Sequence, residues 1–192
     1  MPQTDSNHPF RMHKNLIKDL LIEYVNQVWV SDITYIRVRE KWHYLTLITD
    51  VYSRKIVGYS FSKEMSVQQT TSTAVNMAIK NRKNKTKTIL HSDRGFQYCN
   101  PNFVKYNSTK NIIASMGEKG NPYENAIAER MNGILKYEFG LRYKFKDFTI
   151  ALKEINKAVK LYNNKRPHWS LDLKTPNEVY SQCMANMKNL VS

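Results

Sequence analysis

Three consecutive strand-type segments between residues 27 and 62 constrain the fold of this chain more than any other feature. The segments VWVSDITYIRV, WHYLTLITDVY and KIVGYSFS are rich in Val, Ile, Thr, Tyr and Trp, which favour the pleated surface of a sheet. Short polar breaks at residues 39–41 and 52–54 separate them. Strand patterns joined by breaks this short predict three antiparallel strands in succession.

Beyond residue 62 the pattern changes to helices that alternate with short strands. We expect helices over residues 66–79, 101–109, 123–139 and 148–162, strands over 88–91 and 111–114, and a short helix from 175. Residues 15–25 have a short amphipathic pattern that fits either a helical turn or an extended arm. The expected fold is α/β, with a mixed five-stranded sheet of three antiparallel strands followed by βα units and flanked by helices. This order matches the ribonuclease-H-like architecture.

Three carboxylates require an explanation in this setting. Asp32 lies within the first strand, Asp93 follows the fourth, and Glu129 lies on a helix after a gap of 35 residues from Asp93. In the expected architecture the first and fourth strands are neighbours and the helix packs over the same edge, so the three acids converge. Carboxylates about 4 Å apart repel by roughly 4 kcal/mol per pair at a protein-like effective dielectric. Divalent cations remove this penalty, and an oxygen-only site suits Mg²⁺ or Mn²⁺.

The charge of the chain indicates a polyanionic partner. Thirty Lys and Arg residues stand against 16 Asp and Glu, which gives a formal net charge of +14. Nucleic acid is the commonest partner of such a chain, although a basic surface without a partner remains the alternative. Five basic residues occur within residues 80–87, which fit a solvated loop or a phosphate-contacting loop equally well. Residues 136–174 hold ten Lys or Arg and four Asp or Glu, so this segment either follows DNA or is a solvated helical surface.

Other classes of protein are disfavoured by what the sequence lacks. The two cysteines, Cys99 and Cys183, are far apart and suggest neither a disulfide framework nor a zinc site. No apolar run approaches the roughly 18 residues of a membrane span. The first residues have no apolar core of a signal peptide. We therefore expect a cytoplasmic protein that does not bind membranes.

Several strings give the sequence a resemblance to a known family. They are QVWVSDITYI, LTLITDVYSRKIVGY, HSDRGFQY, GNPYENAIAERMNGILKYE and RPHWSLDLKTP. Their order and spacing over about residues 15–180 resemble the integrase-type (DDE) catalytic core of bacterial insertion-sequence transposases, the group closest to retroviral integrases. Two strings depart in detail: Pro122 stands where many relatives carry Cys, and Glu124 where many carry Asp.

The resemblance implies a reaction and a set of residues for it. The family's two aspartates and glutamate fall on Asp32, Asp93 and Glu129, which would hold two Mg²⁺ or Mn²⁺ ions, with Asp32 bridging both. The implied reactions are hydrolysis that frees a 3′-hydroxyl at an element end, and transesterification that joins this end to target DNA. The family's basic residue seven positions after the glutamate falls on Lys136, which would hold a phosphate.

The expected partner is therefore double-stranded DNA, both element ends and target. We predict DNA contacts by Lys136, Lys83, Lys85, Arg130, Asn125 and Arg166. The family also implies a homo-oligomer assembled on DNA, and a bacterial protein associated with the nucleoid. A catalytically silent, truncated transposase that binds DNA and acts as a regulator is the alternative function, and a structure-directed nuclease on the same fold is a third.

Four further residues near these motifs have two interpretations each. Asp50, at the end of the second strand, is more simply structural, as a partner of Arg54, than a metal ligand. His91 fits a satisfied strand-end histidine better than an outer partner of the metal site. Glu124 lies off the face of Glu129 and suits a helix N-terminus better than the carboxylate site. Tyr123 either stacks on a base or packs locally.

We divide the chain into three parts on this basis. Residues 1–26 form an N-terminal arm, residues 27–145 the integrase catalytic core, and residues 146–192 a basic helical C-terminal extension. Relatives usually carry a helix-turn-helix recognition segment before the core, and this sequence begins after that place. We therefore expect an excised catalytic domain or a truncated copy. The sequence leaves open whether such a chain recognises DNA ends without the helix-turn-helix segment.

Overall fold

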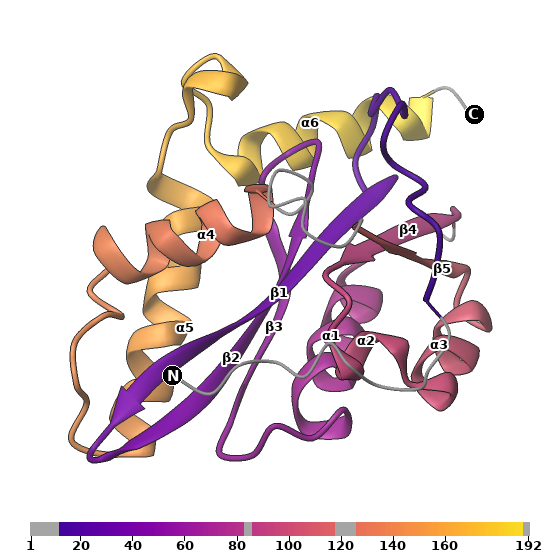
Figure 1. The fold of residues 1–192 in the computed structure, drawn as a ribbon. Helices are drawn as coiled ribbons and strands as arrows, with labels where there is room; N and C mark the ends of the chain where they lie inside the picture. Colours follow the sequence, from indigo (N-terminus) through magenta and orange to yellow (C-terminus); the bar gives the residue numbers. More distant parts are fainter. Residues whose placement is uncertain (1–11, 83–85, 118–125, 190–192) are drawn as a thin grey trace.

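A five-stranded mixed sheet forms the centre of the computed structural model, which describes residues 12–82, 86–117 and 126–189 (Figure 1). The strands are β1 (Val28–Val38), β2 (Lys41–Asp50), β3 (Ile56–Ser62), β4 (Thr88–Ser92) and β5 (Ile112–Met116). Their order across the sheet is β3-β2-β1-β4-β5. The first three strands pair antiparallel, whereas β4 is parallel to β1 and β5 is parallel to β4. The expected α/β, ribonuclease-H-like sheet is therefore confirmed.

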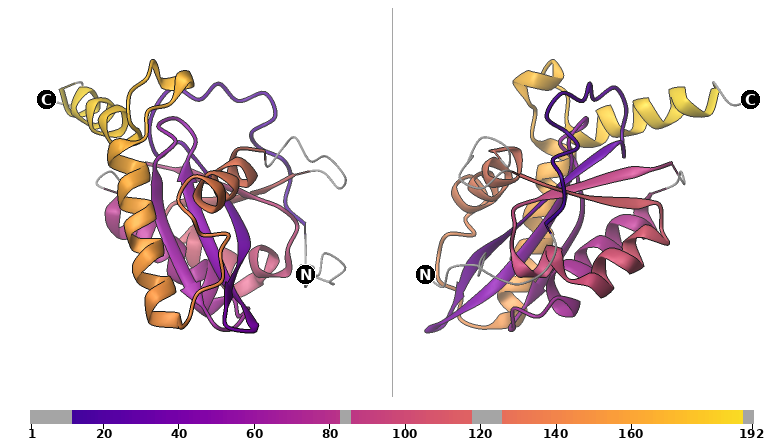
Figure 2. Two further views of the ribbon diagram at one scale, coloured as in Figure 1. Left: turned by 90° about the vertical axis from the view of Figure 1, so that its left-hand side faces the viewer. Right: turned by 45° about the vertical axis from the view of Figure 1, so that its right-hand side comes forward.

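Helices cover both faces of this sheet. They are α1 (Thr73–Asn81), α2 (Phe96–Cys99), α3 (Pro101–Ser108), α4 (Ala126–Tyr137), α5 (Phe148–Lys165) and α6 (Pro176–Asn189). In Figure 1, α1, α2 and α3 lie at the lower right and α4 and α5 at the left, while α6 crosses one end of the sheet at the top there and in Figure 2. No helix in these ranges is both long and apolar enough to cross a membrane.

The two faces are built by simple alternation along the strands. On β3, Ile56 packs in a core cluster with α4 and α5, while its neighbour Val57 packs in a separate cluster with α1, α3 and α6. On β2, Leu47 and Ile48 divide in the same way. Because successive side chains of a strand point to opposite faces, β2 and β3 each contribute to both clusters. This explains why the strand segments are hydrophobic almost throughout.

Several element bounds differ from those expected. A π-helical turn, Gln68–Ser72, precedes α1, because the hydroxyls of Thr70 and Thr73 donate to the carbonyls of Ser66 and Gln68 at 2.6 and 2.8 Å. The short helix α2 was not expected at all. β5 continues to Met116. α6 spans 14 residues, since Tyr180 and Met184 bury one of its faces in the core.

The end of α5 is bound to the start of β3 through side chains. The Asn163 side chain accepts from the backbone N–H of Ile56 at 2.9 Å and donates to the carbonyl of the same residue at 2.9 Å. The Tyr162 hydroxyl donates to the carbonyl of Arg54 at 2.8 Å. These bonds explain why α5 continues to Lys165 rather than ending at residue 162 as expected.

The N-terminal segment lies along the other side of the sheet. Leu16 donates its backbone N–H to the hydroxyl of Ser115 at 2.9 Å, and Met116 donates to the carbonyl of Lys14 at 3.4 Å. No helix forms between residues 12 and 25. Of the two conformations expected for residues 15–25, the extended arm with turns is the one observed.

Gly58 allows α1 to approach β3 more closely than any other residue would permit. A Cβ atom at this position would lie 2.2 Å from the carbonyl oxygen of Ala74 and 2.8 Å from the backbone nitrogen of Ala78. Both are backbone atoms of α1, so no side-chain rotation relieves the clash. The packing of α1 on the sheet therefore depends on this glycine.

We expect Gly58→Ala to lower the free energy of unfolding by about 3 kcal/mol, because α1 must move away from the sheet. The matched control is Gly133→Ala on α4, where an added Cβ meets nothing within 4 Å. This control should gain roughly 0.5–1 kcal/mol from helix propensity. Urea denaturation of both variants measures the difference, and equal stability of the two would contradict the close approach at Gly58.

Candidate active site

The pairing of β1 with β4 brings two aspartates side by side. The strands run parallel, with Ser31 opposite Ser92. Asp32 follows Ser31 within β1, and Asp93 follows Ser92 directly after β4 ends. Two residues 61 positions apart in sequence are thus placed next to each other by strand register alone.

Glu129 reaches the same place from α4, which packs against β1. Its charge raises the pKa of both Asp32 and Asp93, so all three acids lie within one electrostatic neighbourhood. Glu129 is solvent-exposed, whereas the two aspartates are partly buried. Among the described residues, no three His, Cys, Asp or Glu side chains form a tight metal-binding group. Glu129 therefore stands beside the aspartate pair rather than in contact with both.

The Asp32 carboxyl has a strongly altered acidity. Burial, and next the charge of Asp93, raise its pKa from 3.8 to about 7. Hydrogen bonds from the Ile33 backbone and from the Asn132 side chain oppose this rise without cancelling it. A carboxyl so perturbed by burial and by a like charge is typical of functional sites.

Asp93 is held by the turn that follows it. The backbone N–H of Gly95 donates to its Oδ1 at 3.0 Å, which lowers the pKa of Asp93, although burial raises it more. A Cβ on Gly95 would lie 3.0 Å from the same oxygen, so the absence of a side chain permits this contact. The glycine therefore fixes the carboxylate at the end of β4.

Asn132 is a site residue that the sequence did not reveal. Its Nδ2 donates to Asp32 Oδ2 at 2.6 Å, and its Oδ1 is buried without a hydrogen-bond partner among the described residues. Asn132 lies three residues after Glu129 and four before Lys136, so the three side chains share one face of α4. That spacing was the available signal.

Lys136 lies within the electrostatic field of Asp32. Burial lowers the pKa of its ammonium group, and the charge of Asp32 raises it. The Lys136 side chain is therefore partly buried and within reach of the field of Asp32. A cation in this position suits a phosphate that approaches the carboxylates.

A buried tyrosine holds the strand that carries Asp32. The sequence patterns did not reveal this residue either. The hydroxyl of Tyr98, on α2, is 2.6 Å from that of Ser31, the residue before Asp32. Burial raises the pKa of Tyr98 well above 10, and the charges of Asp93 and Asp32 raise it further. Tyr98 therefore stays protonated and fixes β1 against α2.

The other predicted DNA contacts are distributed unevenly. Arg130 is exposed on α4, beside Glu129. Arg166 binds Glu138 through two hydrogen bonds of 2.6 and 2.7 Å, so most of its guanidinium is already engaged. Lys83, Lys85 and Asn125 lie outside the described residues, as do Pro122, Tyr123 and Glu124.

Asp50 and His91 have structural partners. Asp50 accepts from the backbone of Asn26 at 2.6 Å, and from the backbone and hydroxyl of Ser53 at 2.8 and 2.6 Å. The charge of Arg54 lowers the pKa of Asp50, but burial raises it to about 6. His91 is buried, with Nδ1 2.9 Å from the Ser115 hydroxyl. These bonds agree with structural roles for both residues.

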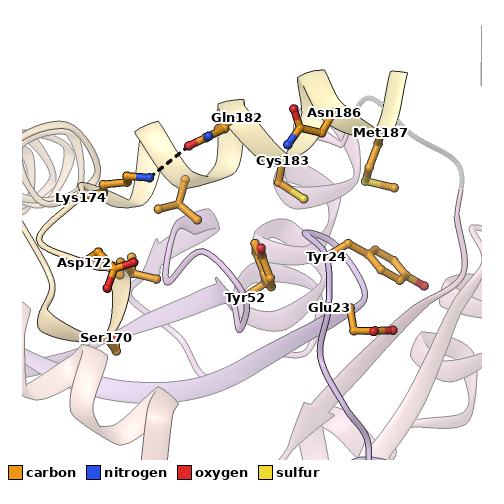
Figure 3. Close-up of a pocket in the computed structure, with 12 residues that line it drawn as sticks. Glu23, Tyr24, Tyr52, Ser170, Asp172, Lys174, Gln182, Cys183, Asn186 and Met187 are labelled. Atoms are coloured by element: carbon orange, nitrogen blue, oxygen red, sulfur yellow. Dashed lines mark hydrogen bonds between the residues drawn. The ribbon is translucent and has the colours of Figure 1, made fainter. Parts of the chain in front are cut away.

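A cavity of about 780 Å³ lies elsewhere, between α6, the N-terminal segment and the turn before α6 (Figure 3). Tyr24, Tyr52, Cys183 and Met187 are among the residues that line it, and Lys174 donates to Gln182 at its rim at 3.4 Å. None of the three acids faces this cavity.

Sequence comparisons identify the family. The integrase core domain family matches residues 23–122, and a second model of the same description matches residues 110–176. An uncharacterised 31 kDa protein of insertion element IS600 from Shigella sonnei is 35% identical over 187 residues, 95% of this chain and 68% of that protein. The transposase InsF of insertion sequence IS3A from Escherichia coli K12 is 37% identical over 132 residues, 68% of this chain and 46% of that protein.

Solved structures with the same fold include retroviral integrases. A chain of the simian T-cell lymphotropic virus intasome, in complex with PP2A regulatory subunit B56 gamma, matches with a TM-score of 0.70 at 21% identity, covering 91% of this chain and 61% of that one. The HTLV-2 integrase catalytic core domain in complex with magnesium matches with a TM-score of 0.63 at 20% identity, covering 81% and 96%. The family models and the shared fold thus define an integrase-type core. The chain belongs to the integrase core domain family, in the branch of insertion-sequence transposases.

The raised pKa of Asp32 gives a prediction for the protein without divalent ions. Its folded-state pKa of about 7 lies above the ordinary 3.8, so between these pH values the folded protein holds a proton that the unfolded chain has lost. Stability therefore falls as pH rises through this window, and the loss is complete above it. Asp32→Asn removes the titration and should be more stable than the wild type at pH 8 by a few kcal/mol, with a smaller difference at pH 5.

Urea denaturation in EDTA at both pH values measures this difference. Asp172→Asn, which changes an exposed aspartate far from the site, is the control and should show no such pH dependence. If the Asp32→Asn variant has the same advantage at pH 5 and pH 8, the pKa of Asp32 is not raised.

Proposed function

We propose that this chain is the metal-dependent core of a DNA transposase that cleaves DNA strands by phosphodiester hydrolysis and joins them by transesterification. The observation that carries the proposal is the parallel register of β1 and β4, which sets Asp32 beside Asp93 within the field of Glu129. The chain spans less than half of the length of its InsF relative, so this activity is inferred for the core alone.

The donor set fits a divalent metal. It consists of carboxylate oxygens only, and the pKa of Asp32 is raised partly by Asp93, a repulsion that a cation relieves. Asp32, Asp93 and Glu129 would hold Mg²⁺ or Mn²⁺, two ions per site. Bound ions of this kind activate an attacking oxygen and stabilise a leaving oxygen in line with it. The related HTLV-2 integrase core was solved with magnesium.

The chain's own residues prepare the site for this chemistry. Asn132 orients the Asp32 carboxylate through a 2.6 Å hydrogen bond, and Gly95 holds Asp93 at 3.0 Å. Both bonds favour the ionised carboxylates that a metal requires. Lys136 places a positive charge beside them for the DNA phosphate. Catalysis by positioning and electrostatics needs such fixed groups more than a protein nucleophile.

Double-stranded DNA is the proposed partner. The net charge of +14 and the exposed position of Arg130 next to Glu129 support contacts to phosphates, with Lys136 as the nearest to the acids. Lys83, Lys85, Asn125 and Arg166 remain predicted contacts. We propose assembly as a homo-oligomer on DNA, in the bacterial cytoplasm at the nucleoid, in keeping with the intasome that contains the simian viral relative.

Asp93→Asn should abolish Mn²⁺-dependent cleavage and joining of oligonucleotides that carry element ends, because one ligand of the metal is lost. DNA binding should persist, since a negative charge is removed and no basic residue is changed. Glu129→Gln should behave in the same way, whereas the exposed control Asp172→Asn should retain activity. Cleavage and joining are measured on denaturing gels, and binding by electrophoretic mobility shift.

Two results would contradict the proposal in different ways. An Asp93→Asn variant that joins DNA as well as the wild type would overturn the metal-site assignment. A wild-type chain that binds DNA but neither cleaves nor joins it, with Mg²⁺ or Mn²⁺, would favour the catalytically silent regulator.

The charge of the chain gives an independent prediction. The logarithm of the affinity for duplex DNA should fall linearly with the logarithm of the salt concentration, because each phosphate contact releases a counterion. Lys136→Gln should reduce the slope by about 1 if Lys136 contacts one phosphate. Fluorescence anisotropy with labelled duplexes measures both, and an affinity independent of salt would exclude phosphate contacts as the basis of binding.

A further inference from the structure

Two tyrosines and an arginine form an exposed group at the C-terminal end of the helix that carries Glu129 and in the turn that follows it. Tyr137 is 70% exposed and Tyr143 is 60% exposed. The guanidinium of Arg142 lies over both rings, 5.6 Å from the centroid of Tyr137 and 4.9 Å from that of Tyr143. Arg142 Nη2 also donates to the Tyr143 hydroxyl at 2.8 Å. We name Tyr137, Arg142 and Tyr143 the aromatic platform.

The backbone holds the aromatic platform in place without any ligand. Gly140 has φ of +75°, a left-handed conformation that ends the helical segment and turns the chain back. Leu141 is then buried in the core cluster beneath α4, and its N–H donates to the carbonyl of Leu135 at 3.3 Å. Arg142 donates its N–H to the carbonyl of Lys136 at 3.2 Å. The platform is thus pre-organised, which lowers the entropic cost of binding.

The positive charge of the platform is not neutralised by nearby acids. Glu138, the nearest carboxylate in sequence, is bound by Arg166 at 2.6 Å. Glu40 is bound by Arg37 and Lys144 at 2.8 and 2.7 Å. In the described part of the chain, Arg142 therefore has aromatic partners and no carboxylate partner.

The chemistry of the aromatic platform fits a nucleic-acid strand. Exposed tyrosine rings offer faces on which unstacked bases stack, whatever the sequence of the bases. An arginine held over the rings adds a cation for the adjoining phosphate. The platform does not serve the hydrophobic core, since both rings are mostly exposed.

We infer that the aromatic platform binds a displaced or single-stranded nucleotide of the DNA, a few nucleotides from the bond that is cleaved. Tyr137 lies eight residues after Glu129 on the same helical segment. Eight residues of α-helix span about 12 Å, which corresponds to three or four nucleotides at about 3.4 Å each. This inference rests on the proposed function, because Glu129 marks the position of cleavage.

The test compares two double variants. One carries Tyr137→Leu and Tyr143→Leu, and the other carries Tyr137→Phe and Tyr143→Phe. Leucine keeps an apolar side chain and removes the ring, whereas phenylalanine keeps the ring. The matched control is Tyr106→Leu on α3, at the lower right of Figure 1, where a 43% exposed tyrosine has Lys110 5.6 Å from its ring. Circular dichroism and thermal melting check that each variant is folded.

The measured quantity is affinity for a duplex with a single-stranded 3′ overhang, over a range of salt concentrations. The double Leu variant should bind at least tenfold more weakly, with an unchanged salt slope, because stacking is lost and no phosphate contact is removed. The double Phe variant and Tyr106→Leu should bind as the wild type does. Arg142→Gln should instead reduce the salt slope.

A substrate series locates the contact. Abasic nucleotides are placed singly along the strand, and the difference between the wild type and the double Leu variant should disappear when the abasic nucleotide is three or four positions from the cleaved bond. Equal binding by the wild type and the double Leu variant would overturn the inference. The proposed function would still hold in that case if the wild type joins DNA. A loss of affinity of the same size in Tyr106→Leu would also overturn it. A wild-type chain without DNA cleavage would overturn the proposed function itself.

Discussion

The parallel pairing of β1 with β4 is the constraint on which the rest of this structure depends. It places two aspartates next to each other at the point where one strand ends and the other continues. Burial, and next the charge of Asp93, raise the pKa of Asp32 to about 7. Such a pair is unfavourable unless a cation joins it. The surrounding contacts, Asn132 to Asp32, Gly95 to Asp93 and Tyr98 to Ser31, hold the pair in place all the same. The folded protein thus keeps two carboxylates in a defined arrangement at a cost in folding stability.

Helix α4 organises everything else around this pair. One face of the helix is buried through Ala128, Met131, Ile134 and Leu135, which fixes its rotation against the sheet. With that rotation fixed, Glu129, Asn132 and Lys136 all face the aspartates, and the chain that continues from its end forms the aromatic platform. A single rigid element thus relates the carboxylate site to surfaces farther along the proposed path of DNA. Positioning of this kind is more precise on a helix than on a loop.

The sequence predicted what short-range patterns determine. The β-branched and aromatic alternation of residues 27–62 specified three strands. The place of Asp93 directly after a buried strand indicated a carboxylate at the carboxyl end of that strand. The bond between Asn132 and Asp32 joins residues 100 positions apart and has no local signal beyond a shared helix face. The length of α6 depends on Tyr180 and Met184 reaching the core, and the π-helical turn depends on threonine hydroxyls that compete for backbone carbonyls. Tertiary contacts of this kind form only when segments distant in the sequence pack together, so local sequence patterns do not predict them.

The bonds at the two outer strands have a consequence for assembly. β3 and β5 are the edges of the sheet, and an edge with free N–H and C=O groups is a template for pairing with another chain. Asn163 occupies both backbone groups of Ile56 as a neighbouring strand would, and the N-terminal segment binds Ser115 and Met116 at the opposite edge. Edge-to-edge pairing between two copies of this chain is therefore disfavoured, and contacts between copies are left to side-chain surfaces.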